Sequence, residues 1–345
     1  MHHPLGSRAG TIRARQTRKL RPALAIGATI LLASCTKAAP VPTAAEAPAP
    51  SDSARVYVTN QLDDTLSVIN ARSNKVIATV PAGTAPEGVA VATDGKHVYV
   101  ADNGSARVSV LDTRTNKIVK TVAVGKGPSG VALSPDGKRL YVTNGGSNSV
   151  SVIDTATYKV AATVKVGVSP VSVAVSRDGA TAYVANAGST KLSVINTGTN
   201  RVSRELPAGR SPVAVAISQD GKTAYVANET AQTVSVIGTG DGTLRTVRVG
   251  EGPFDVAVGP DGRTAYVAVL GPGNVAVLDS GGSRVSATVS VGPPGTDPFN
   301  LEVTKNALYV TNQGAGTVSV IDPGTRKVTA TVTVGNSPYG VAVSP

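Results

Sequence analysis

Short stretches that alternate between apolar and polar or small residues run along most of the chain, from about residue 55 to the C-terminus. One clear example comprises four such segments, 130–134, 139–144, 149–154 and 159–166. Each is rich in Val, Ala and Thr or Ser and is bounded by Gly, Pro, Asn or Asp. This is the pattern of half-buried β-strands that are joined by turns. The pattern therefore predicts units of four antiparallel strands.

Tyrosine recurs at a nearly constant interval through the same region. Successive repeat tyrosines are separated by 42, 42, 42, 42, 41 and 43 residues. Each opens a Tyr-Val-(Thr/Ala)-(Asn/Asp) tetrapeptide, except that Val269 replaces the last residue in the sixth repeat. A period of about 40–45 residues is the span of one four-stranded propeller blade. The repeat tyrosines are Tyr57, Tyr99, Tyr141, Tyr183, Tyr225, Tyr266 and Tyr309.

The two ends of the repeat region predict how the ring closes. The first segment, at Arg55, matches the second strand of a blade, and the missing first strand appears only at residues 340–344. One blade is then assembled from three N-terminal strands and one C-terminal strand, which protects the edges of the sheets. The predicted fold class is all-β: a seven-bladed propeller over residues 54–345.

The first 53 residues have a different composition. Residues 1–21 carry six Lys or Arg and no acid, and an apolar stretch follows at 23–33. This is typical of a secretory signal, and the apolar stretch is shorter than the about 20 residues that span a bilayer. Leu-Ala-Ser-Cys35 resembles the lipobox of bacterial lipoproteins, so we expect a signal peptide at 1–34 and lipidation of Cys35. The alternative is an ordinary signal peptide with an incidental cysteine.

Residues 35–53 are rich in Ala and Pro and predict an extended tether. The expected location is therefore extracytoplasmic, with the protein held to a membrane of the bacterial cell envelope by its lipid. Removal of the signal lowers the formal net charge from +11 by 6 to +5. This mild charge does not by itself indicate nucleic-acid binding. Because Cys35 is the only cysteine, we expect no disulfide and no thiolate chemistry.

Four recurring motifs carry a family resemblance: Tyr-Val-Thr-Asn, Ser-Val-Ile-Asp, Ala-Thr-Val-x-Val-Gly and Gly-Val-Ala-Val-Ser-Pro-Asp-Gly. Together they resemble the YVTN-repeat propellers of archaeal surface-layer proteins and of bacterial extracytoplasmic proteins of the YncE-like kind. The resemblance covers residues 54–345. It implies the propeller fold, whereas related propellers include lactonase-like enzymes and haem-binding domains, and a DNA-binding role has been proposed for some members.

Two columns of polar residues follow from the repeat and have structural explanations. Asp-Gly pairs such as Asp136-Gly137 stand between the first two strands, where hairpin turns explain them without a metal. The Asn or Asp that ends each second strand is expected to cap the following loop through hydrogen bonds to the backbone. The members of that column are Asn60, Asp102, Asn144, Asn186, Asn228 and Asn312.

The loops that join one blade to the next end in Gly-x-x-Pro, and the two residues after each proline differ most between repeats. Both Phe of the chain fall here, in Phe254-Asp255 and Phe299-Asn300, and Tyr339 takes the same position in the next blade. Glu87 belongs to the adjacent blade once the ring is closed. These residues predict a binding site in one sector of the channel mouth: Phe254, Asp255, Phe299, Asn300, Tyr339 and Glu87. The alternative is that they fill space where the ring is slightly irregular.

Catalysis has less support from the sequence. His2 and His3 would leave with the signal, and His97 is expected on the opposite face, so no histidine-based triad or metal site is expected at this mouth. A site for Ca²⁺ or Mg²⁺ would have to use oxygen ligands, with Asp255, Asn300 and Glu251 as candidates. We therefore expect a monomeric, non-catalytic binding or scaffold protein without a cofactor, whose ligand is a protein, peptide or glycan. A lactonase-like hydrolase is the first alternative, and single-stranded DNA binding is the second.

Overall fold

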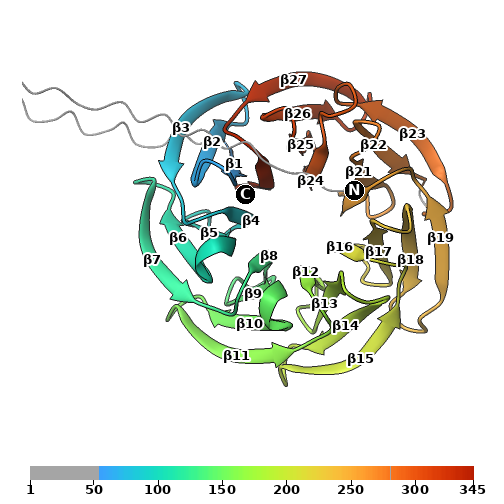
Figure 1. Ribbon diagram of the computed structural model, residues 1–345, viewed down its shortest axis with the longest axis horizontal. Helices are drawn as coiled ribbons and strands as arrows, with labels where there is room; N and C mark the ends of the chain where they lie inside the picture. The colour runs from blue at the N-terminus through green and yellow to red at the C-terminus, as the bar shows by residue number, and fades with distance from the viewer. Residues whose placement is uncertain (1–53, 280) are drawn as a thin grey trace, which may run out of the picture. The chain divides into compact units, whose positions relative to one another are not determined.

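The computed structural model describes residues 54–345 except Ser280, and the predicted signal, Cys35 and tether lie outside the described residues. The described chain forms 28 strands in seven four-stranded antiparallel sheets, arranged as blades around a ring (Figure 1). The seven-bladed propeller that the tyrosine period predicts is confirmed. Within the described residues, no helix has the length and hydropathy needed to cross a bilayer.

The blades are numbered along the chain, and in each the inner strand lies next to the central channel. Blade 1 contains β28 (Pro338–Val343), β1 (Arg55–Asn60), β2 (Thr65–Asn70) and β3 (Lys75–Pro81). Blade 2 contains β4 (Pro86–Val91), β5 (His97–Asp102), β6 (Arg107–Asp112) and β7 (Lys117–Ala123). Blade 3 contains β8 (Pro128–Leu133), β9 (Arg139–Asn144), β10 (Ser149–Asp154) and β11 (Lys159–Lys165). Blade 4 contains β12 (Pro170–Val175), β13 (Thr181–Asn186), β14 (Lys191–Asn196) and β15 (Arg201–Pro207).

The other three blades follow the same order. Blade 5 contains β16 (Pro212–Ile217), β17 (Thr223–Asn228), β18 (Thr233–Gly238) and β19 (Leu244–Arg248). Blade 6 contains β20 (Pro253–Val258), β21 (Ala265–Val269), β22 (Asn274–Leu278) and β23 (Val285–Ser290). Blade 7 contains β24 (Pro298–Val303), β25 (Leu308–Asn312), β26 (Thr317–Asp322) and β27 (Lys327–Thr333). Two short 3₁₀ helices, η1 (Asn103–Ser105) and η2 (Gly145–Ser147), follow β5 and β9.

The ring closes as the sequence predicts. The C-terminal strand β28 pairs antiparallel with β1, with Val343 opposite Val56 and Val341 opposite Val58. The backbone of Arg55 accepts a hydrogen bond from Ser344 at 2.8 Å. This pairing makes the last strand of the chain the innermost strand of the first blade, so neither terminus leaves an unpaired inner strand.

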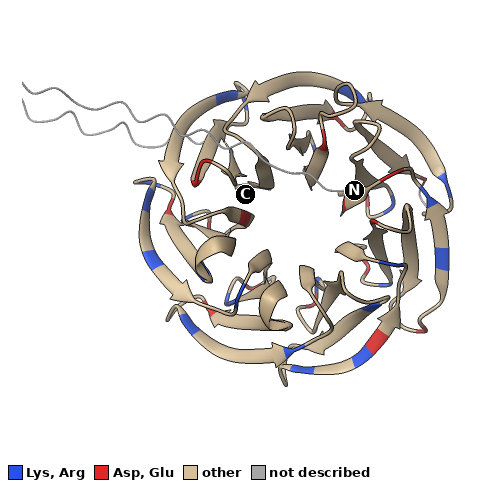
Figure 2. Ribbon diagram, in the orientation of Figure 1, with Lys and Arg blue, Asp and Glu red and all other residues tan. Residues whose placement is uncertain are grey.

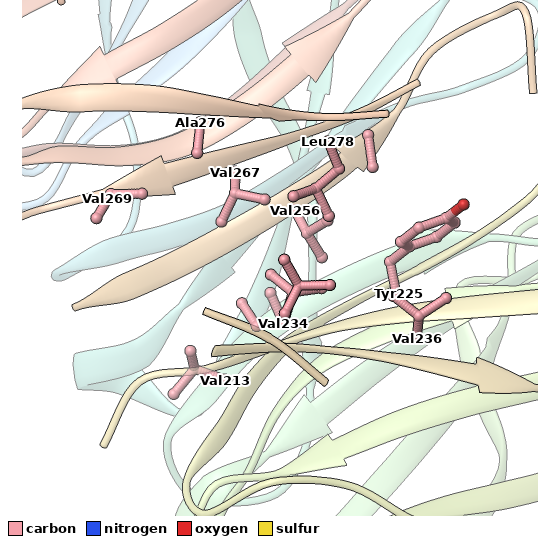
Figure 3. Close-up of a cluster of buried hydrophobic side chains, with 13 residues drawn as sticks. Val213, Tyr225, Val234, Val236, Val256, Val267, Val269, Ala276 and Leu278 are labelled. Carbon is pink, nitrogen blue, oxygen red and sulfur yellow. The ribbon is translucent and has the colours of Figure 1, made fainter. Parts of the chain in front are cut away.

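The hydrophobic core lies between neighbouring blades rather than inside any one of them. Tyr225 of blade 5 packs with Val256 and Val267 of blade 6 in one such cluster (Figure 3). All seven repeat tyrosines are buried, with 0–6% of their surface exposed. Large, planar side chains fit the space between two twisted sheets, which explains why every blade has tyrosine at this position.

The turns obey the local chemistry that the sequence predicts. Gly137 adopts φ 69°, in the left-handed region that favours glycine, and Asp136 accepts a hydrogen bond from the amide of Lys138 at 3.1 Å. In the turns between the third and fourth strands, Asp154 similarly accepts a hydrogen bond from the amide of Thr157 at 2.8 Å. Turn geometry therefore accounts for the aspartates in both kinds of turn, those between the first and second strands and those between the third and fourth.

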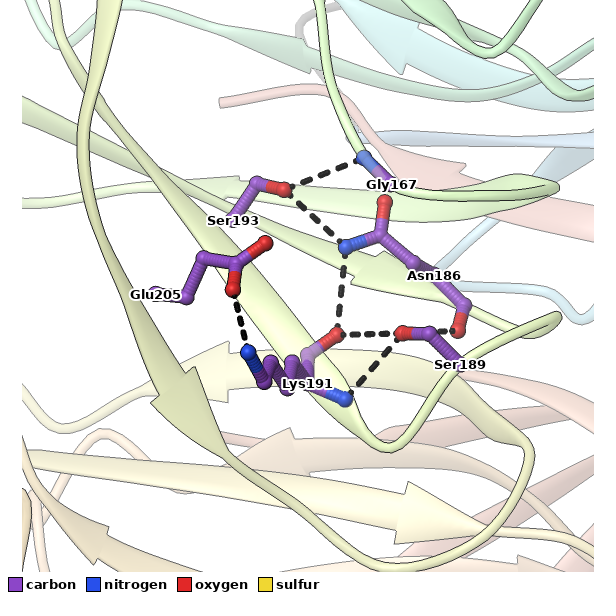
Figure 4. A network of polar contacts seen from close by, with 6 residues as sticks. All are labelled: Gly167, Asn186, Ser189, Lys191, Ser193 and Glu205. Atoms are coloured by element: carbon purple, nitrogen blue, oxygen red, sulfur yellow. Dashed lines mark hydrogen bonds and ion pairs between the residues drawn. The ribbon is translucent and has the colours of Figure 1, made fainter.

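The asparagine column is structural, but its partners differ from those expected. Asn228 is fully buried and donates to Ser235 Oγ at 2.9 Å, on the neighbouring strand of its own blade. Its Oδ1 accepts a hydrogen bond from the amide of Gly209, at 2.9 Å, in the loop that enters the blade. The expected capping of the following loop is thus replaced mainly by bonds between strands. Figure 4 shows the related network of Asn186 with Ser193 and the backbone of Lys191.

The sixth blade supports this interpretation of the column. The serine that serves as partner lies seven residues after each Asn or Asp, at Ser67, Ser109, Ser151, Ser193, Ser235 and Ser319. In blade 6, Val269 replaces the asparagine, and the residue seven positions later is Ala276. Both are buried in the hydrophobic cluster between blades 5 and 6. A buried polar side chain without its partner is costly, so both members of the pair are apolar here.

Candidate functional site

The seven loops between blades present one residue each to the same end of the channel. Every inner strand starts at a buried proline, and the residue before that proline has a positive φ of 48–70° in each blade. The carbonyl of that preceding residue accepts a hydrogen bond from the first residue after the second strand, for example Gln313 to Asp297 at 2.8 Å. We call the residue after the proline the post-proline position. This common geometry places seven post-proline side chains around one mouth of the channel.

A β-bulge lies directly after each proline and adds one residue to the inner strand. In three blades a threonine of the second strand stabilises the bulge. Thr311 Oγ1 accepts a hydrogen bond from the amide of Asn300 at 2.9 Å and donates to the carbonyl of Tyr339 at 2.8 Å. The hydroxyl thus joins the inner strands of blades 7 and 1 at the mouth. Bulges commonly redirect side chains next to a site, and here they shape the channel rim.

Three aromatic side chains at the post-proline position form one stack. The ring centroids of Phe254 and Phe299 are 3.7 Å apart, and those of Phe299 and Tyr339 are 4.5 Å apart. Phe299 lies in the middle and is 6% exposed, whereas Phe254 and Tyr339 are half-buried and line the channel. The three rings therefore form a continuous aromatic wall, in which most of the surface of Phe299 is buried against its two neighbours.

The aromatic wall continues into a polar arc. The hydroxyl of Tyr339 lies 3.4 Å from Ser129 Oγ, although β8 is two inner strands farther round the ring than β28. Glu87, on the strand between them, is buried and accepts a hydrogen bond from Gln61 Nε2 at 3.0 Å. Burial raises the pKa of the Glu87 carboxyl, and burial together with the nearby charge of Glu87 raises the pKa of Tyr339. The predicted residues of this sector are therefore adjacent in space.

Asp255 and Asn300 connect three inner strands. Asp255 Oδ2 accepts hydrogen bonds from Asn300 Nδ2 at 2.9 Å and from the amide of Leu301 at 2.8 Å. The side-chain oxygen of Asn300 accepts a hydrogen bond from the amide of Val341 at 3.2 Å. Burial raises the pKa of Asp255 to about 7, although the backbone amides of Leu301 and Val256 lower it. The pair stabilises the bulges of blades 6, 7 and 1.

Glu302 is a site residue that the sequence prediction missed. It lies two residues after Asn300 on β24 and lines the channel. Burial, followed by the negative charge of Asp255, raises the pKa of Glu302 to about 8. A signal for it was present in the sequence. The corresponding residue is alanine in the six other blades, at Ala90, Ala132, Ala174, Ala216, Ala257 and Ala342, each opposite its repeat tyrosine as Glu302 is opposite Tyr309.

The channel holds a cavity of about 650 Å³ that these side chains border on one side. Small and aliphatic residues such as Val171, Ser172 and Val213 line the other side. Among the described residues that line it, two are acids and none is Lys, Arg or His. Figure 2 shows the contrast with the outer edge of the ring: Lys and Arg recur on the outer strands of the blades, whereas acidic residues occur on inner strands. The candidate site is therefore the acidic and aromatic half of a channel whose other half is lined by small and aliphatic side chains.

The candidate metal ligands are not assembled into one group. Glu251 is exposed on the rim, where its carbonyl accepts a hydrogen bond from the amide of Gly271, and it does not line the cavity. Asn300 turns its amide nitrogen toward Asp255, whereas a hard cation would need its oxygen. In the described part of the chain, no three residues among His, Cys, Asp and Glu lie together in a way that could hold a metal ion. Metal binding by Asp255, Asn300 and Glu251 stays a prediction.

Known structures share the architecture. The chain is similar to hydrazine synthase of Kuenenia stuttgartiensis, with 25% identity, a TM-score of 0.68, and 74% of this chain and 88% of that chain covered. It is also similar in fold to the periplasmic gluconolactonase of Pseudomonas aeruginosa, with 21% identity and a TM-score of 0.69 over 85% and 99% of the two chains. A functionally unknown protein from Desulfotomaculum acetoxidans has 18% identity and a TM-score of 0.73 over 84% and 98%.

The comparison with curated protein sequences found no significant match. A family model does match, over residues 35–135 and 132–221, which together span more than half of the chain. Its description is a YNCE-like β-propeller. The match agrees with the repeat motifs, the seven blades and the closure of blade 1 by both ends of the chain. The chain therefore belongs to the YNCE-like β-propeller family.

Proposed function

We propose that this protein is a non-catalytic binding module whose ligand enters the channel mouth beside Phe254 and Tyr339. The observation that carries the proposal is the stack of three aromatic rings from three successive blades, next to a cavity of about 650 Å³. A cavity of this size, which combines aromatic rings with carboxyl, hydroxyl and amide groups, is a candidate small-ligand site. A small molecule, or one residue of a peptide or glycan, is the ligand that fits it.

The test compares the same position on the two sides of the channel. Phe254→Ala removes one face of the aromatic wall, and Val171→Ala changes the post-proline residue of β12 on the opposite side. Ligands are screened by saturation-transfer NMR, with small metabolites, short peptides and envelope oligosaccharides as probes. We expect at least one class to bind, with a tenfold or greater loss of affinity in Phe254→Ala and no loss in Val171→Ala. Equal effects of the two substitutions, or no binding by any class, would contradict the proposal.

A lactonase-like hydrolase is the second candidate function. It is favoured by the carboxyls of Asp255 and Glu302 in the channel, whose pKa values of about 7 and about 8 suit proton transfer near neutral pH. The likeness in fold to a gluconolactonase leads to the substrate to try first. Hydrolysis of gluconolactone is followed in a pH-stat, with and without Ca²⁺ or Mg²⁺. Turnover that is lost in Glu302→Gln would establish the enzyme in place of the binding module.

Nucleic acid ranks below both candidates. A single-strand binder combines aromatic rings with a basic groove, but the rings here adjoin Glu87, Asp255 and Glu302. An oligonucleotide would meet negative charge at the mouth. Salt-sensitive retention of oligothymidylate that is lost in Phe254→Ala would favour single-stranded DNA over the other ligands.

We also propose that the protein is a monomer anchored to a bacterial membrane by a lipid on Cys35. In the ring, β1 starts at Arg55 on the side of the turns between first and second strands, since Ser344 pairs with Arg55 there, and it ends at Asn60 on the side of the mouth. The first described residue, Ala54, therefore lies on the side of the ring opposite the mouth. Metabolic labelling with a fatty acid, lost in Cys35→Ser, tests the anchor.

A further inference from the structure

Three carboxyl groups in or beside the channel have no cationic partner among the described residues. The ion pairs of the described chain all lie on the surface and involve none of Glu87, Asp255 and Glu302. Buried acids in proteins are normally paired with a positive charge or bound to a metal. Among the described residues that line the channel no such positive charge is present, while the outer strands carry many Lys and Arg that do not line it.

Two of the three carboxyls, those of Asp255 and Glu302, are close enough to affect one another. Leu301, whose amide binds Asp255 Oδ2 at 2.8 Å, directly precedes Glu302 on β24. The negative charge of Asp255 raises the pKa of Glu302, and burial raises the pKa of all three acids. Each of these shifts records the cost of placing negative charge in this channel without a counter-ion. A positively charged ligand would remove that cost.

The aromatic wall defines the rest of the ligand. Phe254 and Tyr339 line the cavity beside the acids, and the face of an aromatic ring attracts a cation within about 6 Å. The opposite side of the cavity offers aliphatic surface from Val171 and Val175, both half-buried. An ammonium group next to carboxyls and aromatic rings, attached to an apolar body, therefore complements every side of the cavity.

We propose that the channel binds a small organic cation, an amine with an apolar body, whose ammonium group lies against Glu302 and Asp255. This inference rests on the proposed binding function and specifies its ligand class. It distinguishes an amine from a neutral sugar, which needs hydrogen bonds but no charge. It also distinguishes an amine from a bare metal ion, which needs a set of oxygen ligands rather than an apolar wall.

The experiment uses three probes with the same ring and different charge: benzylammonium, benzyl alcohol and benzoate. Binding to the purified protein is measured by calorimetry and ligand-observed NMR at pH 8. We expect benzylammonium to bind at least tenfold more tightly than benzyl alcohol, and benzoate not to bind. Glu302→Gln should reduce binding of the amine at least tenfold and leave that of the alcohol unchanged. Glu229→Gln, an exposed acid on a neighbouring loop, is the matched control and should change neither.

A second measurement does not depend on the fold of any variant. Because a bound cation favours ionised carboxyls, binding at pH 7 should release protons, which calorimetry in two buffers of different ionisation enthalpy detects. The affinity for benzylammonium should rise from pH 6 to pH 8. Equal affinity for amine and alcohol, lost only in Phe254→Ala, would overturn the amine class but retain the binding site. Binding of Ca²⁺ alone, or no binding by any of the three probes, would also overturn the amine class, whereas the proposed binding function fails only if the wider ligand screen also finds no ligand.

Discussion

Two arcs of the same ring of inner strands have the same backbone and different side chains. On β8, β12 and β16, the post-proline residues are Ser129, Val171 and Val213, and the channel wall is small or aliphatic. On β20, β24, β28 and β4, the same position holds Phe254, Phe299, Tyr339 and Glu87. Both arcs retain the proline, the bulge and the loop hydrogen bonds. The repeat thus accounts for the ring, and departures from the repeat account for the candidate site.

The largest effect is expected from the centre of the aromatic stack. Phe299→Ala removes a buried ring that contacts Phe254 on one side and Tyr339 on the other. We expect the free energy of unfolding to fall by about 3–4 kcal/mol, since the neighbours can only partly fill the cavity. Denaturant unfolding measures it, with Phe254→Ala expected to cost less because that ring is half-buried. A larger loss in Phe254→Ala would show that the stack is not organised around Phe299.

The asparagine column tests how much the buried Asn–Ser pairs within the blades contribute to the stability of the ring. Asn228→Val leaves Ser235 and the amide of Gly209 without their partner. We expect a loss of about 2 kcal/mol, and part of it should be regained in Asn228→Val/Ser235→Ala, which copies Val269 and Ala276 of blade 6. A double-mutant cycle by thermal unfolding measures the coupling. Strictly additive losses would mean that the two side chains do not act as a pair.

Three acids with raised pKa values, two in the channel and Asp102 at the end of β5, predict an unusual dependence of stability on pH. For Asp102, Asp255 and Glu302, the folded pKa values of about 6, 7 and 8 exceed those of the unfolded chain. The unfolded chain therefore loses these protons at lower pH than the folded protein does, and stability falls as pH rises from about 4 to 8. Surface acids such as Asp112 and Asp154 have lowered pKa values in the folded protein. Their contribution to stability is therefore present above the pKa of the unfolded chain and is lost as pH falls through the lowered values. The maximum stability is thus expected near pH 5.

The source of that dependence can be assigned by substitution. Glu302→Gln removes one raised carboxyl and its repulsion of Asp255, so the loss of stability between pH 5 and pH 8 should shrink by on the order of 1–2 kcal/mol after solvent screening. Thermal unfolding at both pH values measures it, and Glu229→Gln serves as the control on an exposed loop. An unchanged pH profile in Glu302→Gln would show that its carboxyl is well solvated.

The smallest effect is expected where a bulge has a supporting hydroxyl. Thr143 Oγ1 accepts a hydrogen bond from the amide of Gly130 at 2.8 Å and donates to the carbonyl of Val171 at 2.9 Å. Ala185 takes the same place in blade 4 without such support. Thr143→Ala should therefore fold normally and lose about 1 kcal/mol by chemical denaturation. A loss no greater than that of Thr121→Ala, on the exposed strand β7, would show that the hydroxyl is dispensable.

The ring could be predicted from the sequence because each of its features is local and repeated. The tyrosine period gives the blade, Asp136-Gly137 gives a turn, and residues 340–344 give the closing strand. The placement of Phe254, Phe299 and Tyr339 in one sector followed from the order of the blades. Their stacking did not, because side-chain packing depends on distances that the order does not specify.

Two other features of the site needed three-dimensional information. Glu302 stands out only when the alanine column opposite the repeat tyrosines is compared, and that column looks like plain core until the channel is seen. The bonds of Asn300 to Asp255 and to Val341 join residues 45 and 41 positions apart, on three different inner strands. Local patterns cannot show which atom of the amide faces which strand.

The most direct test of a site in the acidic and aromatic arc is a crystallographic fragment screen of the ring. All strands of the ring lie between Arg55 and Val343, so a chain from residue 54 contains the whole closure. Soaked fragments that carry an amine should bind against Phe254, Tyr339 and Glu302. No separate fragment should bind to the arc of Val171 and Val213, which should contact only the fragments that are bound at those three residues. Fragments spread evenly over the surface, with the channel mouth empty, would contradict the assignment of a binding site to this arc.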